Sequence, residues 1–264
     1  MKLFTRAILR KPGKSFVNAI AQDPHHEKPD YEKTMTEYLH YADTLRKMGL
    51  DLIICEADEN FPDGNFVEDT YLILGKKVKI ELNPGTPTRA GEPMSLAPHL
   101  PTDIPLQKIS KEYTIDGGDI LKDGKNIYVG LSKRTQQEAI NELSEIATPL
   151  GYHVHTISVP QGLHLKSGMT CILPNHFIIQ QAFENILKKM QETDPRIQYF
   201  VVPPEESYAA NVLPINNKIM IPTGCPIAKQ YIAQYYSEQD IYEVDTQQAR
   251  LVDGALTCSN LLLR

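Results

Sequence analysis

The sequence predicts an α/β fold in which a strand–turn–strand–helix unit recurs along the chain. Short apolar and β-branched runs, bounded by turn residues, occur throughout the 264 residues. Amphipathic segments with helical spacing lie between those runs. Tight polar turns recur at intervals of about 42 to 50 residues, at 75–77, 123–126, 174–176 and 216–218. Because the length suits one core and no linker divides the chain, we predict a single domain over residues 1–264.

The strands are predicted from runs rich in leucine, isoleucine, valine and tyrosine that end at turn residues. These runs are residues 3–9, 50–55, 70–74, 127–130, 154–159, 170–173, 177–180, 199–202, 219–221, 241–244 and 261–263.

Four helices are predicted between the strands. Asp30 can cap the first, which keeps one apolar face and ends at Gly49. Thr135 and the glutamate three residues later form a capping-box pattern at the start of the second. The third spans about 182–190, and the fourth covers about 226–235, with a proline in its first turn.

The repeat suggests an array that closes around an axis. A fifth copy would join the C-terminal run 256–263 to the N-terminal strand 3–9, and closure would bring the first strand of every copy to a common centre. An ordinary open α/β sheet fits the pattern equally well. A nucleotide-binding version of that sheet is disfavoured, because no GxGxxG or P-loop motif follows a strand.

Composition excludes several classes of function. The net charge is −6 with acids and bases interspersed, so no basic stripe predicts nucleic-acid binding. No window reaches the apolar length of a membrane span, and the N-terminus lacks an apolar signal core, which together predict a cytoplasmic protein. The four cysteines, at 55, 171, 225 and 258, form no CxxC pair; we expect free thiols and no zinc site.

Cys258 is the candidate nucleophile. It begins an apolar strand beside Gly254 and Thr257, which is unlike the setting of a core cysteine, although a structural role is the common one for a lone cysteine. A nucleophilic cysteine needs a partner that favours the thiolate and handles protons. His164 leads into the third copy of the repeat, where a polar residue should face the centre; the alternative is a histidine with a structural role.

Two acidic pairs precede apolar strands at the same point of the repeat as the cysteine. They are Glu68 with Asp69, and Asp116 with Asp119. Acids at strand edges commonly cap turns, but in a closed array these acids would converge with the histidine and the thiol. Carboxylates near a thiolate repel it unless a cation lies among them.

A planar guanidinium is the cation that matches paired carboxylates best, because it can bind each of them through two hydrogen bonds. Arg89 and Arg134 lie in loops and could clamp an α-carboxylate of the same ligand, although exposed arginines often only contact solvent. The charge pattern therefore favours a small-molecule guanidino substrate.

Seven blocks in order make the sequence resemble the dimethylarginine dimethylaminohydrolase family, within the superfamily of guanidino-group-modifying enzymes and amidinotransferases. The resemblance covers nearly the whole chain. The blocks are residues 61–69 (FPDGNFVED), 83–89 (NPGTPTR), 116–119 (DGGD), 130–135 (GLSKRT), 163–167 (LHLKS), 206–211 (ESYAAN) and 252–258 (VDGALTC).

The resemblance implies a five-bladed α/β-propeller of pseudo-fivefold ββαβ repeats and a reaction that needs no metal or organic cofactor. It implies that Cys258 is the nucleophile, His164 the general acid and base, and Asp116 the third catalytic residue. It implies that Asp69 binds the guanidinium, and the two arginines named above, Arg89 and Arg134, the carboxylate of the substrate. The further substrate positions that it implies are Asp63, Glu68 and Phe16, the last in place of the usual leucine of the family.

The implied reaction is hydrolysis of Nω-methylated arginine to citrulline and a methylamine through a covalent S-alkylthiouronium intermediate. Other guanidino chemistry on the same site, such as hydrolysis of arginine or amidino transfer, is the nearest alternative. A non-catalytic methylarginine sensor is a second one, against which the intact Cys258, His164 and Asp116 argue. We expect a monomer or a homodimer.

Overall fold

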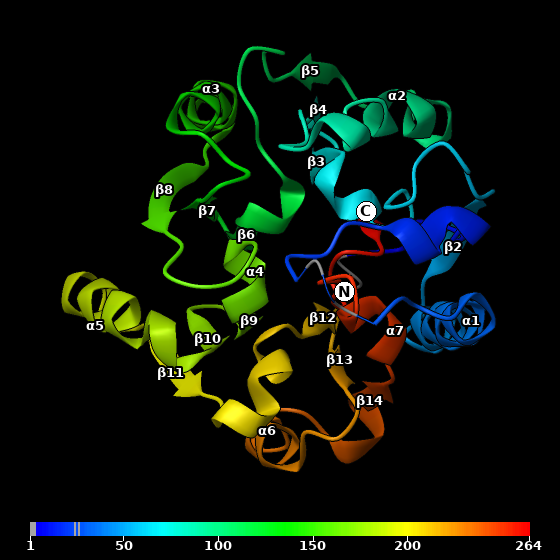
Figure 1. Cartoon of the computed structure of the whole chain (residues 1–264). Coiled ribbons are helices and arrows are strands. Elements are labelled where there is room, and N and C mark those ends of the chain that lie inside the picture. Colours follow the sequence, from blue (N-terminus) through cyan, green and yellow to red (C-terminus); the bar gives the residue numbers. More distant parts are fainter. Residues whose placement is uncertain (1–3, 24, 26) are drawn as a thin grey trace.

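Five three-stranded sheets stand in a ring in the computed structural model, which describes residues 4–23, 25 and 27–264 (Figure 1). The sheets are β3 (Tyr71–Leu74), β4 (Val78–Glu81) and β5 (Leu106–Lys108); β6 (Ile120–Asp123), β7 (Asn126–Leu131) and β8 (His153–Ser158); β9 (Met169–Leu173), β10 (His176–Ile179) and β11 (Gln198–Val201); β12 (Leu213–Ile215), β13 (Lys218–Pro222) and β14 (Ile241–Val244); and β15 (Leu261–Leu263), β1 (Arg6–Arg10) and β2 (Asp51–Cys55).

Every sheet has the same topology. The first strand pairs antiparallel with the second, and the second pairs parallel with the third, as in β3–β4–β5. A parallel pair needs a crossover, and a helix supplies it on the outside of the ring (Figure 1). The crossover helices are α1 (Tyr31–Lys47), α2 (Glu92–Leu96), α3 (Gln137–Ala147), α5 (Glu184–Thr193) and α6 (Pro226–Ile232). The predicted pseudo-fivefold ββαβ propeller is confirmed.

The two ends of the chain close the ring. Strand β15 pairs antiparallel with β1, with Arg6 opposite Leu263 and Ile8 opposite Leu261. The predicted fifth copy is thereby confirmed, and the open-sheet alternative is wrong. The N-terminal strand was expected from Leu3, which lies outside the described residues; the observed strand begins at Arg6.

The four polar turns share one backbone geometry. Each places one residue in the left-handed region: Gly75 at φ 63°, Gly124 at φ 59°, Asn175 at φ 57° and Asn216 at φ 58°. Glycine and asparagine adopt this conformation at the lowest cost, which explains why these residue types recur there. Each turn joins the first and second strands of its sheet, so the turns mark the same end of the ring.

The apolar core consists of clusters between neighbouring blades. One contains Leu72 and Ile80 of the β3–β5 blade with Val129 and Leu143 of the next. The other blade interfaces are built likewise, for example by Leu121 of β6 against Phe177 of β10. A single blade cannot bury its own faces, so the stability of each depends on its two neighbours.

The sequence patterns missed the strands β4, β5, β6 and β12. β5 is exposed along its whole length, so it carries no apolar run. β6 ends in two charged residues, and Pro214 interrupts β12. Each of these strands is held in its sheet by hydrogen bonds to a neighbouring strand, and local sequence patterns do not reveal such a partner.

The helix ends also differ in places. Asp30 caps α1 as predicted, its carboxylate accepting from the Lys33 amide at 2.8 Å. The capping box at Thr135 is wrong: α3 begins at Gln137, and the Thr135 hydroxyl donates instead to Asp119 at 2.7 Å. α5 and α6 end at residues 193 and 232, displaced from the predicted ends. Within the described ranges, no helix combines the length and apolar character needed to cross a membrane.

Candidate active site

Short turns before the first strands contain or directly follow five of the candidate residues, namely Glu68, Asp69, Asp116, His164 and Cys258. These turns are η2 (Val67–Asp69), η5 (Gly117–Asp119), α4 (Leu165–Gly168), η8 (Pro204–Ala210) and the turn segment 251–259 that precedes β15. They gather at one end of the ring axis. The carboxylates of Asp69 and Asp116 and the imidazole of His164 have ligand atoms within 4.8 Å of one another. The convergence expected from the repeat therefore occurs for these three residues.

Asp116 and His164 form a buried hydrogen-bonded pair. The His164 Nε2 lies 2.8 Å from Asp116 Oδ2, and the Gly85 amide donates to Oδ1 at 2.7 Å. Burial alone would lower the pKa of His164, but the hydrogen bond with Asp116 and the charge of Asp69 outweigh it and raise that pKa to about 9. The imidazole is therefore protonated at neutral pH, as a general acid requires.

The two glycines of the DGGD block allow the site to assemble. A Cβ atom on Gly117 would lie 1.9 Å from the carbonyl oxygen of Glu68, and one on Gly118 would lie 2.5 Å from His164 Nδ1. Only glycine permits η5 to approach both neighbouring blades this closely. The Gly118 amide also donates to Asp69 Oδ1 at 2.7 Å.

Arg89 is a buried ion-pair centre rather than an exposed loop residue. Its Nη1 donates to Asp69 Oδ2 at 2.6 Å, while Nε and Nη2 bind Glu92 at 2.9 and 2.8 Å. Nη2 also donates to the Phe66 carbonyl at 3.0 Å. Burial raises the pKa of Asp69, but the Arg89 charge and its hydrogen bond more than reverse this, so that pKa falls to about 2. Asp69 is therefore ionised throughout the neutral range.

Arg134 approaches the other carboxylate of the cluster. Its Nη1 lies 3.5 Å from Asp116 Oδ2 and donates to the Thr86 hydroxyl. Its side chain is 13% exposed, against 5% for that of Arg89, so Arg134 is the more accessible of the two arginines.

Cys258 lies between an apolar cluster and the acids. It packs against Phe16, Ala19, Phe66 and Val252, and its carbonyl accepts from the Glu68 amide at 3.0 Å. Burial, followed by the charges of Glu68 and Asp69, raises the pKa of the thiol to about 12. The free thiol is therefore neutral at pH 7, and a cation placed among these acids would favour the thiolate.

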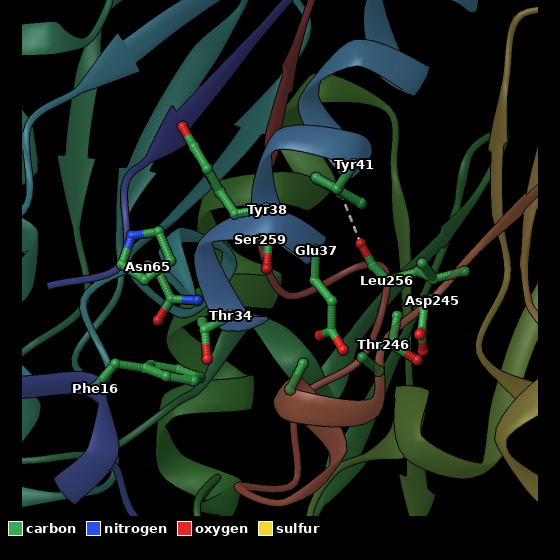
Figure 2. A pocket seen from close by; sticks show the side chains of 13 residues that line it. Phe16, Thr34, Glu37, Tyr38, Tyr41, Asn65, Asp245, Thr246, Leu256 and Ser259 are labelled. Carbon is green, nitrogen blue, oxygen red and sulfur yellow. Dashed lines mark hydrogen bonds between the residues drawn. The ribbon is translucent and has the colours of Figure 1, made fainter. Parts of the chain in front are cut away.

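Phe16 and Asp63 shape the surroundings of the thiol. Phe16 is fully buried and meets Phe66 edge to face at 5.8 Å, and Asp63 Oδ1 accepts from the Ile20 amide at 3.1 Å. Figure 2 shows Phe16 at a cavity of about 40 Å³ that reaches Leu256, whose carbonyl accepts from Tyr41 at 2.7 Å. The 16–20 segment is thus fixed against the segment that bears the cysteine.

Sequence reasoning missed three polar residues here. Lys166 binds Glu68, and Asn211 binds both Lys166 and Thr257. The blocks at 163–167 and 206–211 contain Lys166 and Asn211, but nothing local indicates their partners. Asp119 has a structural role: it accepts from the Ser132 and Thr135 hydroxyls and from the Leu165 amide.

The Asp69, Asp116 and His164 cluster has the donor atoms of a metal site, yet its charges already have partners. Arg89 neutralises Asp69, and Arg134 and the protonated His164 face Asp116. An added divalent ion would have to compete with these cations, so the charge balance of the cluster does not favour a metal ion.

The raised pKa of His164 predicts a pH-dependent stability. The group binds its proton more tightly in the folded state, so its contribution is complete below pH 6.5 and is lost as pH rises through about 9. We expect the free energy of unfolding to fall by up to about 3 kcal/mol over this range relative to His164→Gln.

NMR titration of the imidazoles gives the direct measurement of this effect. His176, whose pKa burial lowers, is the internal control and should titrate below the ordinary histidine value. A His164 resonance that titrates near 6.5 would contradict the geometry of the Asp116 pair.

The fold and the site assign this chain to a class of enzymes, the five-bladed α/β-propellers with cysteine chemistry at the ring axis. A family model described as N,N dimethylarginine dimethylhydrolase, eukaryotic, matches residues 11–198. The N(G),N(G)-dimethylarginine dimethylaminohydrolase of Pseudomonas aeruginosa is 30% identical over 98% of this chain and 99% of its own length. The chain belongs to the dimethylarginine dimethylaminohydrolase family.

Two further relatives agree with this assignment. The dimethylarginine dimethylaminohydrolase of Streptomyces coelicolor is 27% identical over 98% of this chain and 97% of its own length. A solved structure of the Pseudomonas aeruginosa enzyme, a cysteine-to-serine mutant complexed with citrulline, matches with a TM-score of 0.91 at 29% identity. That match covers 98% of this chain and 99% of the solved chain.

Proposed function

We propose that this chain hydrolyses Nω-methylated arginine to citrulline and a methylamine. The observation that carries the proposal is the axial cluster in which Asp69 adjoins the Asp116–His164 pair, while the amide of Glu68, the neighbour of Asp69 in η2, donates to the Cys258 carbonyl at 3.0 Å. The relatives from Pseudomonas aeruginosa and Streptomyces coelicolor are named for this activity, and the former has been solved with citrulline.

The substrate guanidinium binds between Asp69 and Asp116. Each carboxylate has about four lone-pair sites, and two contacts on Asp69 leave room for a planar cation. Four of the five N–H groups of Arg89 are engaged, so Arg134 is the main clamp on the substrate carboxylate and Arg89 a secondary one. The remaining substrate contacts come from Glu68, from Asp63 and from the backbone carbonyl of Phe16.

The first chemical step forms a covalent intermediate. The positive charge of the bound substrate lowers the pKa of the Cys258 thiol, and the thiolate attacks the guanidinium carbon. The tetrahedral adduct collapses as protonated His164 gives its proton to the departing methylamine. General acid catalysis of this kind contributes roughly 10² to 10⁴ in rate. The S-alkylthiouronium remains on the enzyme.

The second step returns the enzyme to its starting state. His164 is now neutral and accepts a proton from water, which attacks the same carbon. The carbon–sulfur bond breaks, the hydroxyl proton of the adduct passes to the departing sulfur as the carbonyl of citrulline forms, and citrulline leaves beside the restored thiol. Asp116 holds the imidazole in place through both steps and stabilises its charged form.

Timed assays with asymmetric dimethylarginine, monomethylarginine and arginine test the proposal. Citrulline and dimethylamine should form in equal amounts from the first substrate. Turnover of arginine with ammonia release, or amidino transfer to an added amine, would replace the proposal with another guanidino activity. Binding of dimethylarginine without any product would indicate the sensor. A cytoplasmic location and a monomeric or homodimeric state stay predictions.

A further inference from the structure

A ring of hydrogen bonds links four blades directly beneath the proposed nucleophile. Lys166 Nζ binds Glu68 Oε1, and the Thr257 hydroxyl donates to Glu68 Oε2 at 3.0 Å. Asn211 Nδ2 donates to the Thr257 hydroxyl at 3.1 Å and to the Lys166 carbonyl at 2.9 Å, and Asn211 Oδ1 accepts from the Thr257 amide at 3.1 Å. Thr257 directly precedes Cys258, so this ring fixes the backbone of the nucleophile.

Glu68 contacts the cysteine segment twice. Its side chain holds the Thr257 hydroxyl, and its amide donates to the Cys258 carbonyl at 3.0 Å. The Glu68 and Lys166 side chains are only 14% and 9% exposed, so the carboxylate has little solvent to screen it. The only cation that bonds to Glu68 in the described chain is Lys166.

The charged and titratable groups around the Cys258 thiol come from several elements. Glu68 and Asp69 of η2 disfavour the thiolate, and Lys166 of α4 favours it. Tyr41 of α1 and Tyr208 of η8 also interact electrostatically with the sulfur, and burial raises the pKa of both. The Asp116–His164 pair lies next to Asp69, which is one of these charged residues. Lys166 is thus the cation that opposes the nearest acids.

Lys166 lines a cavity whose lining includes none of Asp69, Asp116, His164 and Cys258. This cavity of about 450 Å³ is lined by the first strands of the blades and extends to the hairpin turns at Gly75 and Gly124. Glu68, Lys166 and Thr257 line the same cavity, next to the turn that bears the cysteine. The lysine therefore takes no part in the bond changes proposed above.

We infer that Lys166 is a positioning residue, which neutralises Glu68 beneath Cys258 and thereby keeps the thiol ionisable and its turn in place. The inference rests on the proposed function only in taking Cys258 as the nucleophile. It assigns the lysine an electrostatic task that a purely structural residue would not have.

Alkylation of Cys258 by iodoacetamide, followed by peptide mass spectrometry at pH 8.5, tests the inference without substrate. The reagent is neutral, so its approach does not depend on the acids. Lys166→Met should slow alkylation about three- to tenfold, since loss of the cation raises the pKa of the thiol and lowers the thiolate fraction while partly increasing the nucleophilicity of the thiolate. Glu68→Gln should accelerate alkylation, and the double variant should return close to the wild-type rate.

Controls separate charge from structure. Lys166→Arg keeps the charge and should stay within about twofold of wild type. Lys79→Met removes a partly buried lysine of β4 that donates to the Pro101 carbonyl in the crossover of its own blade, and it should leave the rate unchanged. If Lys166→Met does not fold, the direction in which Glu68→Gln changes the alkylation rate still tests the inference.

Two results would overturn the inference: slower alkylation in Glu68→Gln, or no recovery in the double variant, either of which makes the ring a structural brace only. Failure of the proposed function is a separate outcome. It would appear as a wild-type protein that alkylates at Cys258 yet forms no citrulline from any of the three substrates.

Discussion

Cys258→Ser is expected to lower turnover of dimethylarginine on the order of 10⁴-fold or more, because a serine hydroxyl does not ionise near neutral pH and the covalent step depends on an anionic nucleophile. The substitution should leave the site assembled, since the bond from the Glu68 amide to residue 258 uses the backbone carbonyl. Citrulline release measures the loss, and calorimetric titration with dimethylarginine should show binding within about tenfold of wild type.

Cys225→Ser is the matched control for this experiment. Cys225 is also a free cysteine, but it lies in the apolar cluster between the β9–β11 and β12–β14 blades, where the acids that act on its thiol are Glu206 and Glu243. Its replacement should cost some stability and leave turnover per folded molecule unchanged. Retention of more than about a tenth of the activity in Cys258→Ser would rule out the covalent route.

The repeat explains why so much of the site was predictable. Four site residues each precede the first strand of a blade: Asp69, Asp116, His164 and Cys258. The sequence period alone therefore predicts that they lie at the same height along the ring axis. The same period allowed a fifth copy in which β15 pairs with β1, as the structure shows. What the period could not supply was ring closure itself, because an open sheet accepts the same run of strands and helices.

The residues that were missed act through partners on other blades. Lys166 and Glu68 are 98 positions apart, and Asn211 and Thr257 are 46 apart, so no local spacing connects them. The sequence does not reveal the burial of Arg89 for the same reason, because its partner Asp69 lies 20 positions away on another segment. The charge pattern predicts a cation among the acids, and Arg89 of the protein itself supplies part of that positive charge.

Arg89→Met is expected to lower the free energy of unfolding by about 3 to 5 kcal/mol, because it leaves two buried carboxylates without their cation. Asp69 and Glu92 would each lose a direct ion pair in surroundings where their side chains are at most 5% exposed. Burial raises the pKa of Glu92 to about 7, so Asp69 carries most of the unpaired charge at neutral pH. Urea unfolding at pH 7 measures the loss. Arg196→Met is the matched control, since its ion pair with Asp194 lies at the surface and its removal should change stability little.

The pH dependence of this loss identifies its cause. In the wild type the pKa of Asp69 is lowered to about 2, so the stabilisation by its charge is complete above its ordinary value near 3.8 and disappears as pH falls toward 2. Without Arg89, burial would raise that pKa, and protonation would relieve the unpaired charge at a milder pH. The difference between variant and wild type should therefore be largest near neutral pH and shrink in acid. A difference that stays constant from pH 7 to pH 4 would instead assign the loss to packing, because methionine leaves the same gap at every pH while only a charge can be titrated away.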